Sequence, residues 1–151
     1  MTVKTLPSVE VSEDAIVLAV TASEEDVRSL RLLCEGSCWD LRLARSFREA
    51  RAWLSQHSSP VVLCAPRLPD GDWKTVLRFT EGLPDPPNLV VFSRQADNRM
   101  WTEVLNLGGF DVLAFPTVQR ELLYTISTAW RNWEDRAHTQ CGEAEAIAHC
   151  V

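Results

Sequence analysis

The chain has 151 residues, 46% of them hydrophobic, and this length and composition favour one globular domain with a single core. Its formal net charge is −6 and no run of Lys and Arg exceeds two residues, which argues against nucleic-acid binding. No stretch approaches 18 apolar residues, and the start of the chain lacks the pattern of a secretory leader. The sequence therefore predicts a cytoplasmic domain that does not insert into membranes.

Five cysteines lie at irregular spacing, which fits neither a disulfide framework nor a common zinc site. We expect reduced thiols, with Cys64 packed inside a strand. That position also argues against Cys64 as a nucleophile, because no His is expected beside it.

Five segments have the character of β-strands. Continuous apolar runs are typical of strands that are buried on both faces of a parallel sheet. Four such runs occur, at residues 15–21, 60–65, 88–93 and 110–115. Residues 39–45 instead alternate apolar and polar side chains, as expected of a half-exposed strand at a sheet edge.

A segment with helical periodicity follows each of these strands. Ser23, Ser46 and Asp72 are typical N-cap residues at the start of the first three helices. Gly108 is expected to end the fourth helix, and Thr117 opens the fifth. Strand and helix thus alternate five times, which predicts an α/β fold: a doubly wound, five-stranded parallel sheet with helices on both faces.

Three regions are expected along the chain. Residues 1–14 form an acidic lead-in, and residues 15–133 form the domain. Residues 134–151 lose amphipathic order, as a linker or a disordered tail does. One alternative is therefore that the chain is the N-terminal regulatory head of a longer transcription regulator.

The stretch at residues 59–73 is the one around which the domain is arranged. A buried strand ends at Ala65 and passes into a turn that contains Pro69, Asp70 and Gly71. In an open parallel sheet, binding and chemistry gather just beyond such carboxyl ends. Ala65, however, carries no reactive group at the place where one is expected.

Three features resemble the CheY-like receiver domain of two-component response regulators. They are the segment LPDGDW at residues 68–73, the segment GGFDVLAFP at residues 108–116, and the five strand–helix units over residues 15–133. The resemblance implies the strand order 2-1-3-4-5. It also implies a family chemistry in which a histidine kinase donates a phosphoryl group to an aspartate after the third strand, with Mg²⁺ held by acidic residues after the first.

The residues that perform this chemistry in the family are replaced in this sequence. Carried over by motif, the phosphoacceptor position falls on Ala65, and the phosphate-neutralising lysine falls on Phe115. The acidic pair falls within Thr21, Ala22 and Ser23, whereas Mg²⁺ requires carboxylate oxygens. The resemblance therefore predicts a degenerate receiver, or pseudo-receiver, with no phosphorylation, no metal, no cofactor and no enzymatic activity.

Other family features are kept in part. Ser93 matches the switching Ser or Thr after the fourth strand, and Pro116 keeps the place of the family's cis proline. Arg94 stands where a small residue usually follows, and the aromatic residue of the switch falls on Val112. The usual switch therefore lacks its second member.

We expect such a module to signal through protein contacts, independently of phosphorylation. In the family, the surface formed by the fourth helix, the fifth strand and the fifth helix is the usual site of dimer and effector contacts. Trp101, Trp130 and Trp133 fall on these two helices, and tryptophan is a frequent interface anchor. The expected partner is a second copy, a sensor kinase or an output protein.

Alternative roles for the pocket remain open. A flavodoxin-like protein that binds a small ligand or a nucleotide would need a glycine-containing phosphate loop after the first strand, and residues 21–23 show only a trace of one. Arg67 and Arg94 at the pocket rim are also consistent with a small anion site. We favour a surface ion pair of these arginines with Asp70 and Asp72.

Overall fold

The computed structural model describes the backbone of residues 15–150 and the side chains of residues 15–136; the acidic lead-in expected at residues 1–14 lies outside them. Five parallel strands form one sheet in the order β2-β1-β3-β6-β7. They are β1 (Ile16–Val20), β2 (Asp40–Ala44), β3 (Val61–Cys64), β6 (Asn88–Ser93) and β7 (Asp111–Ala114). Counted within this sheet, the strand order is 2-1-3-4-5, which matches the order implied by the resemblance.

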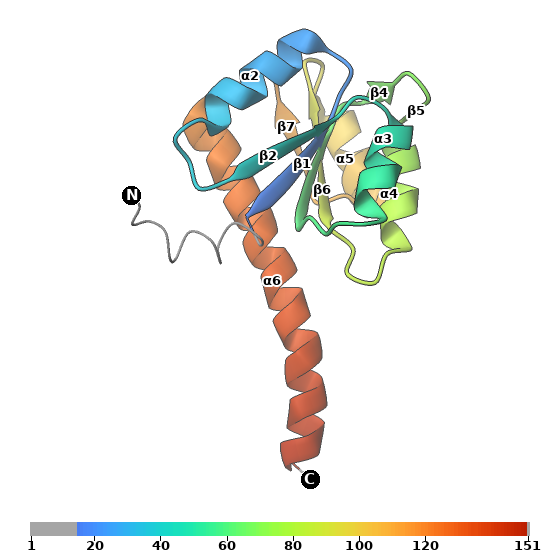
Figure 1. The fold of residues 1–151 in the computed structure, drawn as a ribbon, viewed down its shortest axis with the longest axis vertical. Helices are drawn as coiled ribbons and strands as arrows, with labels where there is room; N and C mark the ends of the chain where they lie inside the picture. The colour runs from blue at the N-terminus through green and yellow to red at the C-terminus, as the bar shows by residue number, and fades with distance from the viewer. Residues whose placement is uncertain (1–14, 151) are drawn as a thin grey trace.

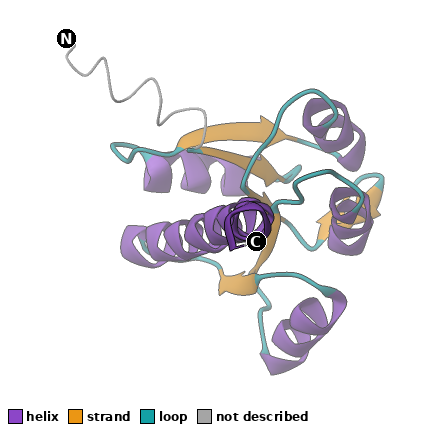
Figure 2. Cartoon of the chain, turned by 90° about the horizontal axis from the view of Figure 1, so that it is seen from below, coloured by secondary structure: helices purple, strands orange, loops and turns teal. Residues whose placement is uncertain are grey.

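Helices cover both faces of the sheet (Figure 1). On one face lie α2 and α6, and on the other lie α3, α4 and α5 (Figure 2). Their bounds are α2 (Glu24–Cys34), α3 (Phe47–Leu54), α4 (Trp73–Glu81), α5 (Asn98–Leu107) and α6 (Gln119–Cys150). Because the strands are parallel, the loops that follow them meet at one edge of the sheet.

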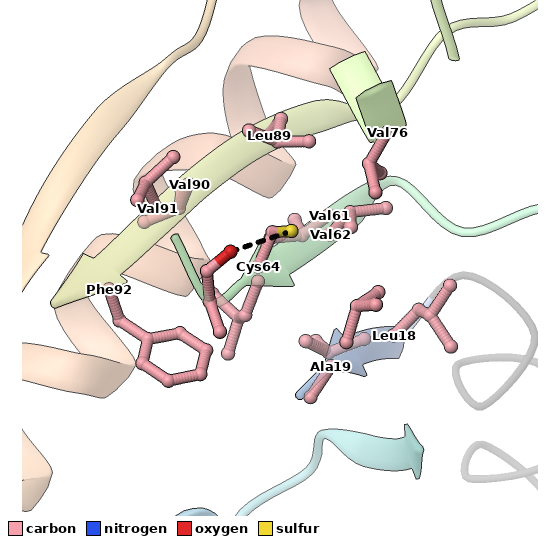
Figure 3. Close-up of a cluster of buried hydrophobic side chains, with 14 of the residues drawn as sticks. Leu18, Ala19, Val61, Val62, Cys64, Val76, Leu89, Val90, Val91 and Phe92 are labelled. Carbon is pink, nitrogen blue, oxygen red and sulfur yellow. Dashed lines mark hydrogen bonds between the residues drawn. The ribbon is translucent and has the colours of Figure 1, made fainter. Parts of the chain in front are cut away.

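The core lies between the central strands and these two helix layers. All residues of β3 are buried, and β1 and β6 are buried after their first residue. Figure 3 shows the aliphatic side chains of β3 and β6 beside Leu18 and Ala19 of β1. The edge strand β2 is only partly buried, as its alternating pattern predicts. None of the described helices is long and apolar enough to span a bilayer.

The predicted helix caps are confirmed. The side chains of Ser23, Ser46 and Asp72 each accept a hydrogen bond from the backbone N–H three residues further on, at 3.1 to 3.2 Å. These bonds satisfy amides that have no partner within the helix. Gly108 ends α5 with φ of 110°, a conformation that glycine adopts without steric cost.

Two features differ from the sequence prediction. The loop after β3 contains a short antiparallel hairpin, formed by β4 (Arg67–Leu68) and β5 (Gly71–Asp72). In addition, α6 continues to Cys150 instead of ending near Trp133. The segment after Trp133 is rich in Ala and Glu, which have high helix propensity, so the helix continues after the amphipathic pattern is lost.

Candidate functional site

A cavity of about 640 Å³ opens at the carboxyl edge of the sheet, where the loops after β1, β3, β6 and β7 meet. The residues predicted for the pocket converge on it from these four loops. Those that line it are Thr21, Ala22, Ser23, Ala65, Arg67, Ser93, Arg94 and Phe115. The lining is completed by residues that the sequence analysis did not assign to the pocket: Asp26, Pro66, Phe92, Gln95 and Met100.

The polar residues after β1 build the start of α2. Thr21 is buried, and its N–H donates to the Ala44 carbonyl oxygen at 2.9 Å. Its Oγ1 accepts a hydrogen bond from the Ser23 N–H at 3.2 Å, and the Ser23 hydroxyl in turn caps α2. These hydroxyl oxygens therefore stabilise the backbone of a helix N-terminus.

The floor of the cavity at the end of β3 is apolar. Ala65 is 6% exposed, and its N–H donates to the Val20 carbonyl oxygen at 2.9 Å, which continues the pairing with β1. The preceding Cys64 is buried, and its thiol donates to the Ala65 carbonyl oxygen at 3.2 Å (Figure 3). Burial, with a smaller contribution from the charge of Asp72, raises the pKa of Cys64 far above its ordinary value. The thiol is therefore a poor nucleophile.

Phe115 forms an apolar wall beside this floor. It is 5% exposed and packs against Phe92 with ring centroids 4.9 Å apart. The Phe115–Pro116 peptide bond is cis, as predicted for Pro116. A lysine at this position would lose hydration among apolar groups, whereas full burial of a phenylalanine side chain contributes about 1.5–3 kcal/mol.

Arg94 joins this cavity to the first turn of α2. Its Nη2 lies 2.8 Å from Asp26 Oδ1 and 3.8 Å from Glu25 Oε2. Its Cζ lies 6.0 Å from the centroid of the Phe115 ring, within the range of a cation–π contact. The guanidinium group therefore has acidic partners on α2 and an aromatic surface below it.

The sequence analysis predicted that Arg67 and Arg94 form ion pairs with Asp70 and Asp72. This prediction is wrong. Arg94 binds α2 instead, and Arg67 forms no ion pair with the side chains that the structure describes. The backbone of Arg67 pairs with that of Asp72 in the hairpin, a local partner that the sequence analysis missed. The positions of these charges depend on how the loops meet, which their sequence spacing does not show.

Asp70 has a different role, as a cap for α3. Its two carboxylate oxygens accept hydrogen bonds from the N–H groups of Phe47 at 2.8 Å and Arg48 at 3.0 Å. These bonds hold the pKa of Asp70 below its ordinary value, and the bond from Phe47 has the largest effect. Asp70 therefore ties the hairpin to the neighbouring helix.

The hydroxyl of Ser93 is engaged within its own loop. Ser93 is buried at the end of β6, and its Oγ accepts a hydrogen bond from the Gln95 N–H at 3.0 Å. Its carbonyl oxygen accepts one from the Phe115 N–H at 2.9 Å. Val112, to which the resemblance assigns the position of the switch aromatic, lies on β7 and has no ring to couple to this hydroxyl.

The side chains around the cavity do not fit Mg²⁺. Asp26 is the only carboxylate among the described residues that line it, and Arg94 already pairs with that carboxylate. Mg²⁺ prefers one or two carboxylates together with water or phosphate oxygens. Within residues 15–136, no group of three or more His, Cys, Asp or Glu side chains is placed to hold a metal ion.

The three tryptophans predicted as contacts differ in their surroundings. Trp101 is 49% exposed on α5 and lines a groove of about 390 Å³ with Val112 and Ala114 of β7. Trp130 packs edge-on against Trp39, with ring centroids 6.0 Å apart, and Trp133 is partly buried. Trp101 is therefore the most exposed of the three, whereas Trp130 is explained by packing within the domain.

Comparison with known proteins identifies the fold. No protein-family model matches the chain, and no curated protein matches its sequence. The signal receiver domain of an HD domain-containing protein from Pseudomonas fluorescens Pf-5 is similar in structure, with a TM-score of 0.75 and 22% identity over 84% of this chain and 94% of that chain. The chain has the receiver-domain fold.

Other solved receiver domains are similar to the same extent. A CheY-like response regulator receiver domain protein from Methanospirillum hungatei JF-1 has a TM-score of 0.71 and 18% identity over 82% of this chain and 98% of that chain. The beryllofluoride-activated NtrC4 receiver domain dimer has a TM-score of 0.71 and 24% identity over 79% and 98%. At these identities the likeness establishes the receiver fold alone.

Proposed function

We propose that the chain is a receiver-fold signalling module that is not phosphorylated after β3 and that acts through protein contacts. Ala65 at the end of β3 carries the proposal. Its methyl group lines the cavity in the place where the resemblance requires a carboxylate. A methyl group cannot attack phosphorus, so we assign the module no enzymatic step.

The neighbouring side chains support the same proposal. The only carboxylate that the described residues contribute to the cavity is neutralised by Arg94, and Phe115 replaces the expected ammonium group with a packed ring. Clustered acidic side chains repel one another and lose hydration when they are buried. With Ala65 and Phe115 in the cavity, there is no cluster of buried carboxylates in it among residues 15–136, so the domain needs no cation to offset their repulsion.

We assign the protein contact to the face formed by α5, β7 and α6, with Trp101 as its anchor. Trp101 is half exposed beside a groove lined by β7, and tryptophan is over-represented among residues that dominate binding energy. The NtrC4 receiver domain was solved as a beryllofluoride-activated dimer. In the present chain, pairing with a second copy or another signalling protein would proceed without such an activator.

Labelling tests the proposal directly. The protein is incubated with Mg²⁺ and either acetyl phosphate or beryllofluoride, and its intact mass and amide NMR spectrum are recorded. We expect no phosphorylated species and no shifts around the cavity, because Ala65 cannot accept the group. The NtrC4 receiver domain provides the positive control for beryllofluoride. Stoichiometric labelling of an aspartate would contradict the proposal.

A further inference from the structure

We propose that the contact between Arg94 and the first turn of α2 is a built-in latch that holds the loop between β6 and α5 in one position. The latch consists of Arg94, Asp26 and Glu25, and the loop comprises residues 94–97. It differs from a phosphorylation switch because all three charged side chains belong to the unmodified chain. It therefore operates whether or not any modification occurs.

The latch lies across the end of β3, beside the small side chain of Ala65. Arg94 follows β6 and Asp26 lies on the helix that follows β1, whereas β3 separates these two strands in the sheet. The pair therefore bridges two loops across the end of β3. Asp26, Ala65 and Arg94 all line the same cavity. A larger, charged side chain in place of Ala65 would compete for the Arg94 guanidinium and for this space.

The start of α2 provides a firm anchor for the latch. Ser23 caps the helix, and Thr21 is held by the Ala44 carbonyl oxygen. Glu24, two residues before Asp26, pairs with Arg45 in the loop after β2. The first turn of α2 thus binds two arginines from two different loops, and its acidic side chains also interact favourably with the helix dipole.

The latch positions the first turn of α5, which carries Trp101. Residues 94–97 lead directly into α5, whose N-cap Asp97 accepts a hydrogen bond from the Met100 N–H at 2.9 Å. Farther along the helix, Glu103 pairs with Lys74 of α4 at 2.8 Å. Release of the latch should therefore loosen residues 94–102 more than the rest of α5.

The strength of the latch follows from its partial burial. The side chain of Asp26 is 14% exposed and that of Arg94 is 44% exposed, so water screens part of the attraction. Ion pairs of this kind change a local equilibrium by a few-fold. We therefore expect faster local opening without the latch, and an otherwise intact domain.

Hydrogen exchange measured by mass spectrometry on the full chain tests the latch. In Arg94→Gln, we expect exchange in residues 94–102 to be about three- to fivefold faster, with no change in peptides from β3. Asp26→Asn should have a similar effect, and the double variant should exchange no faster than Arg94→Gln alone, because one interaction is lost in all three.

Arg42→Gln is the matched control, because it removes an arginine from an exposed pair with Asp40 on β2, at 2.9 Å, away from the loop. Unchanged exchange at residues 94–102 in Arg94→Gln would overturn the latch. So would additive effects in the double variant, or equal acceleration in Arg42→Gln or in β3. None of these results depends on phosphoryl labelling, so failure of the latch and failure of the proposed function are separate outcomes.

Discussion

Phe115 illustrates how one side chain alters the chemistry of the cavity. Its ring packs against Phe92, and such aromatic pairs contribute about 0.5–1.5 kcal/mol beyond the burial of their area. A lysine ammonium in its place would need an acceptor, and the cavity's Asp26 carboxylate is already bound by Arg94. Phe115 and Ala65 thus give this cavity an apolar wall and floor, where the resemblance implies charged groups.

The cysteines provide a prediction at the same scale. Cys38 is exposed, whereas Cys34 and Cys64 are buried. Burial raises the pKa of Cys34 to about 11 and that of Cys64 further, and only the thiolate reacts with iodoacetamide. At pH 8 we expect Cys38 to be modified at least about ten times faster than either buried thiol.

Peptide mapping of the native protein measures each cysteine separately. Protein unfolded in urea is the control, because all cysteines are then open to the reagent. Rapid modification of Cys64 in the native protein would contradict its burial at the end of β3.

Contacts between elements depend on a few capping side chains, and Asp70 is the clearest case. The hairpin of β4 and β5 carries Asp70 to the N-terminus of α3, where its carboxylate accepts bonds from Phe47 and Arg48. The helix has only eight residues, so free amides are a large part of its backbone. A negative charge at this end also interacts favourably with the helix dipole.

Asp70→Asn should therefore lower the urea midpoint of unfolding at pH 7. The pKa of Asp70 is lower in the folded protein than in the unfolded chain. Its contribution is thus fully present above the ordinary carboxyl pKa of about 4, and it is lost as the pH falls through the folded value. The difference in midpoint between the variant and the wild type should shrink accordingly between pH 7 and about pH 3.

Asp85→Asn is the matched control for this measurement. Asp85 is exposed in the loop before β6, with no hydrogen bond or ion pair to the side chains described here. Its replacement should leave the midpoint unchanged at both pH values. Equal midpoints for Asp70→Asn and the wild type at pH 7 would show that the cap does not stabilise α3.

For the molecule as a whole, hydrogen bonds fix the position of α6, one of the three elements of the proposed contact face. Asn88 Nδ2 donates to the Ala129 carbonyl oxygen at 2.8 Å and to Asn132 Oδ1 at 3.0 Å. Arg136 donates to the Pro86 carbonyl oxygen at 3.2 Å. These bonds hold α6 against the amino end of β6, and the helix then runs beyond the sheet (Figure 1).

Trp101→Ala tests the contact face proposed for the assembled molecule. If a second copy binds there, removal of this anchor should raise the dissociation constant about tenfold or more. Size-exclusion chromatography with light scattering over a range of concentrations measures this change. Leu32→Ala is the control, because Leu32 is 64% exposed but lies on α2. A wild-type chain that stays monomeric throughout would exclude the homodimer.

Local patterns in the sequence were sufficient to predict the five strand–helix units and the three N-caps. They also predicted that Ala65 lies at the end of the third strand of the sheet. Apolar runs and capping side chains act within a few residues, so they are visible before the chain is folded. The extension of α6 was missed because helix propensity persists there after the amphipathic pattern ends. The convergence of the pocket residues followed from the parallel sheet, since its strand ends share one edge.

Only the tertiary structure decided which charges meet. Arg94 and Asp26 are 68 positions apart, and Asp70 lies 23 positions from Phe47. Several acids were available to each arginine, and sequence spacing did not distinguish among them. The sequence thus determined the fold class and placed an alanine at the end of β3, whereas folding selected the partners of Arg94 and Asp70, because charge pairing depends on distance in space and not along the chain.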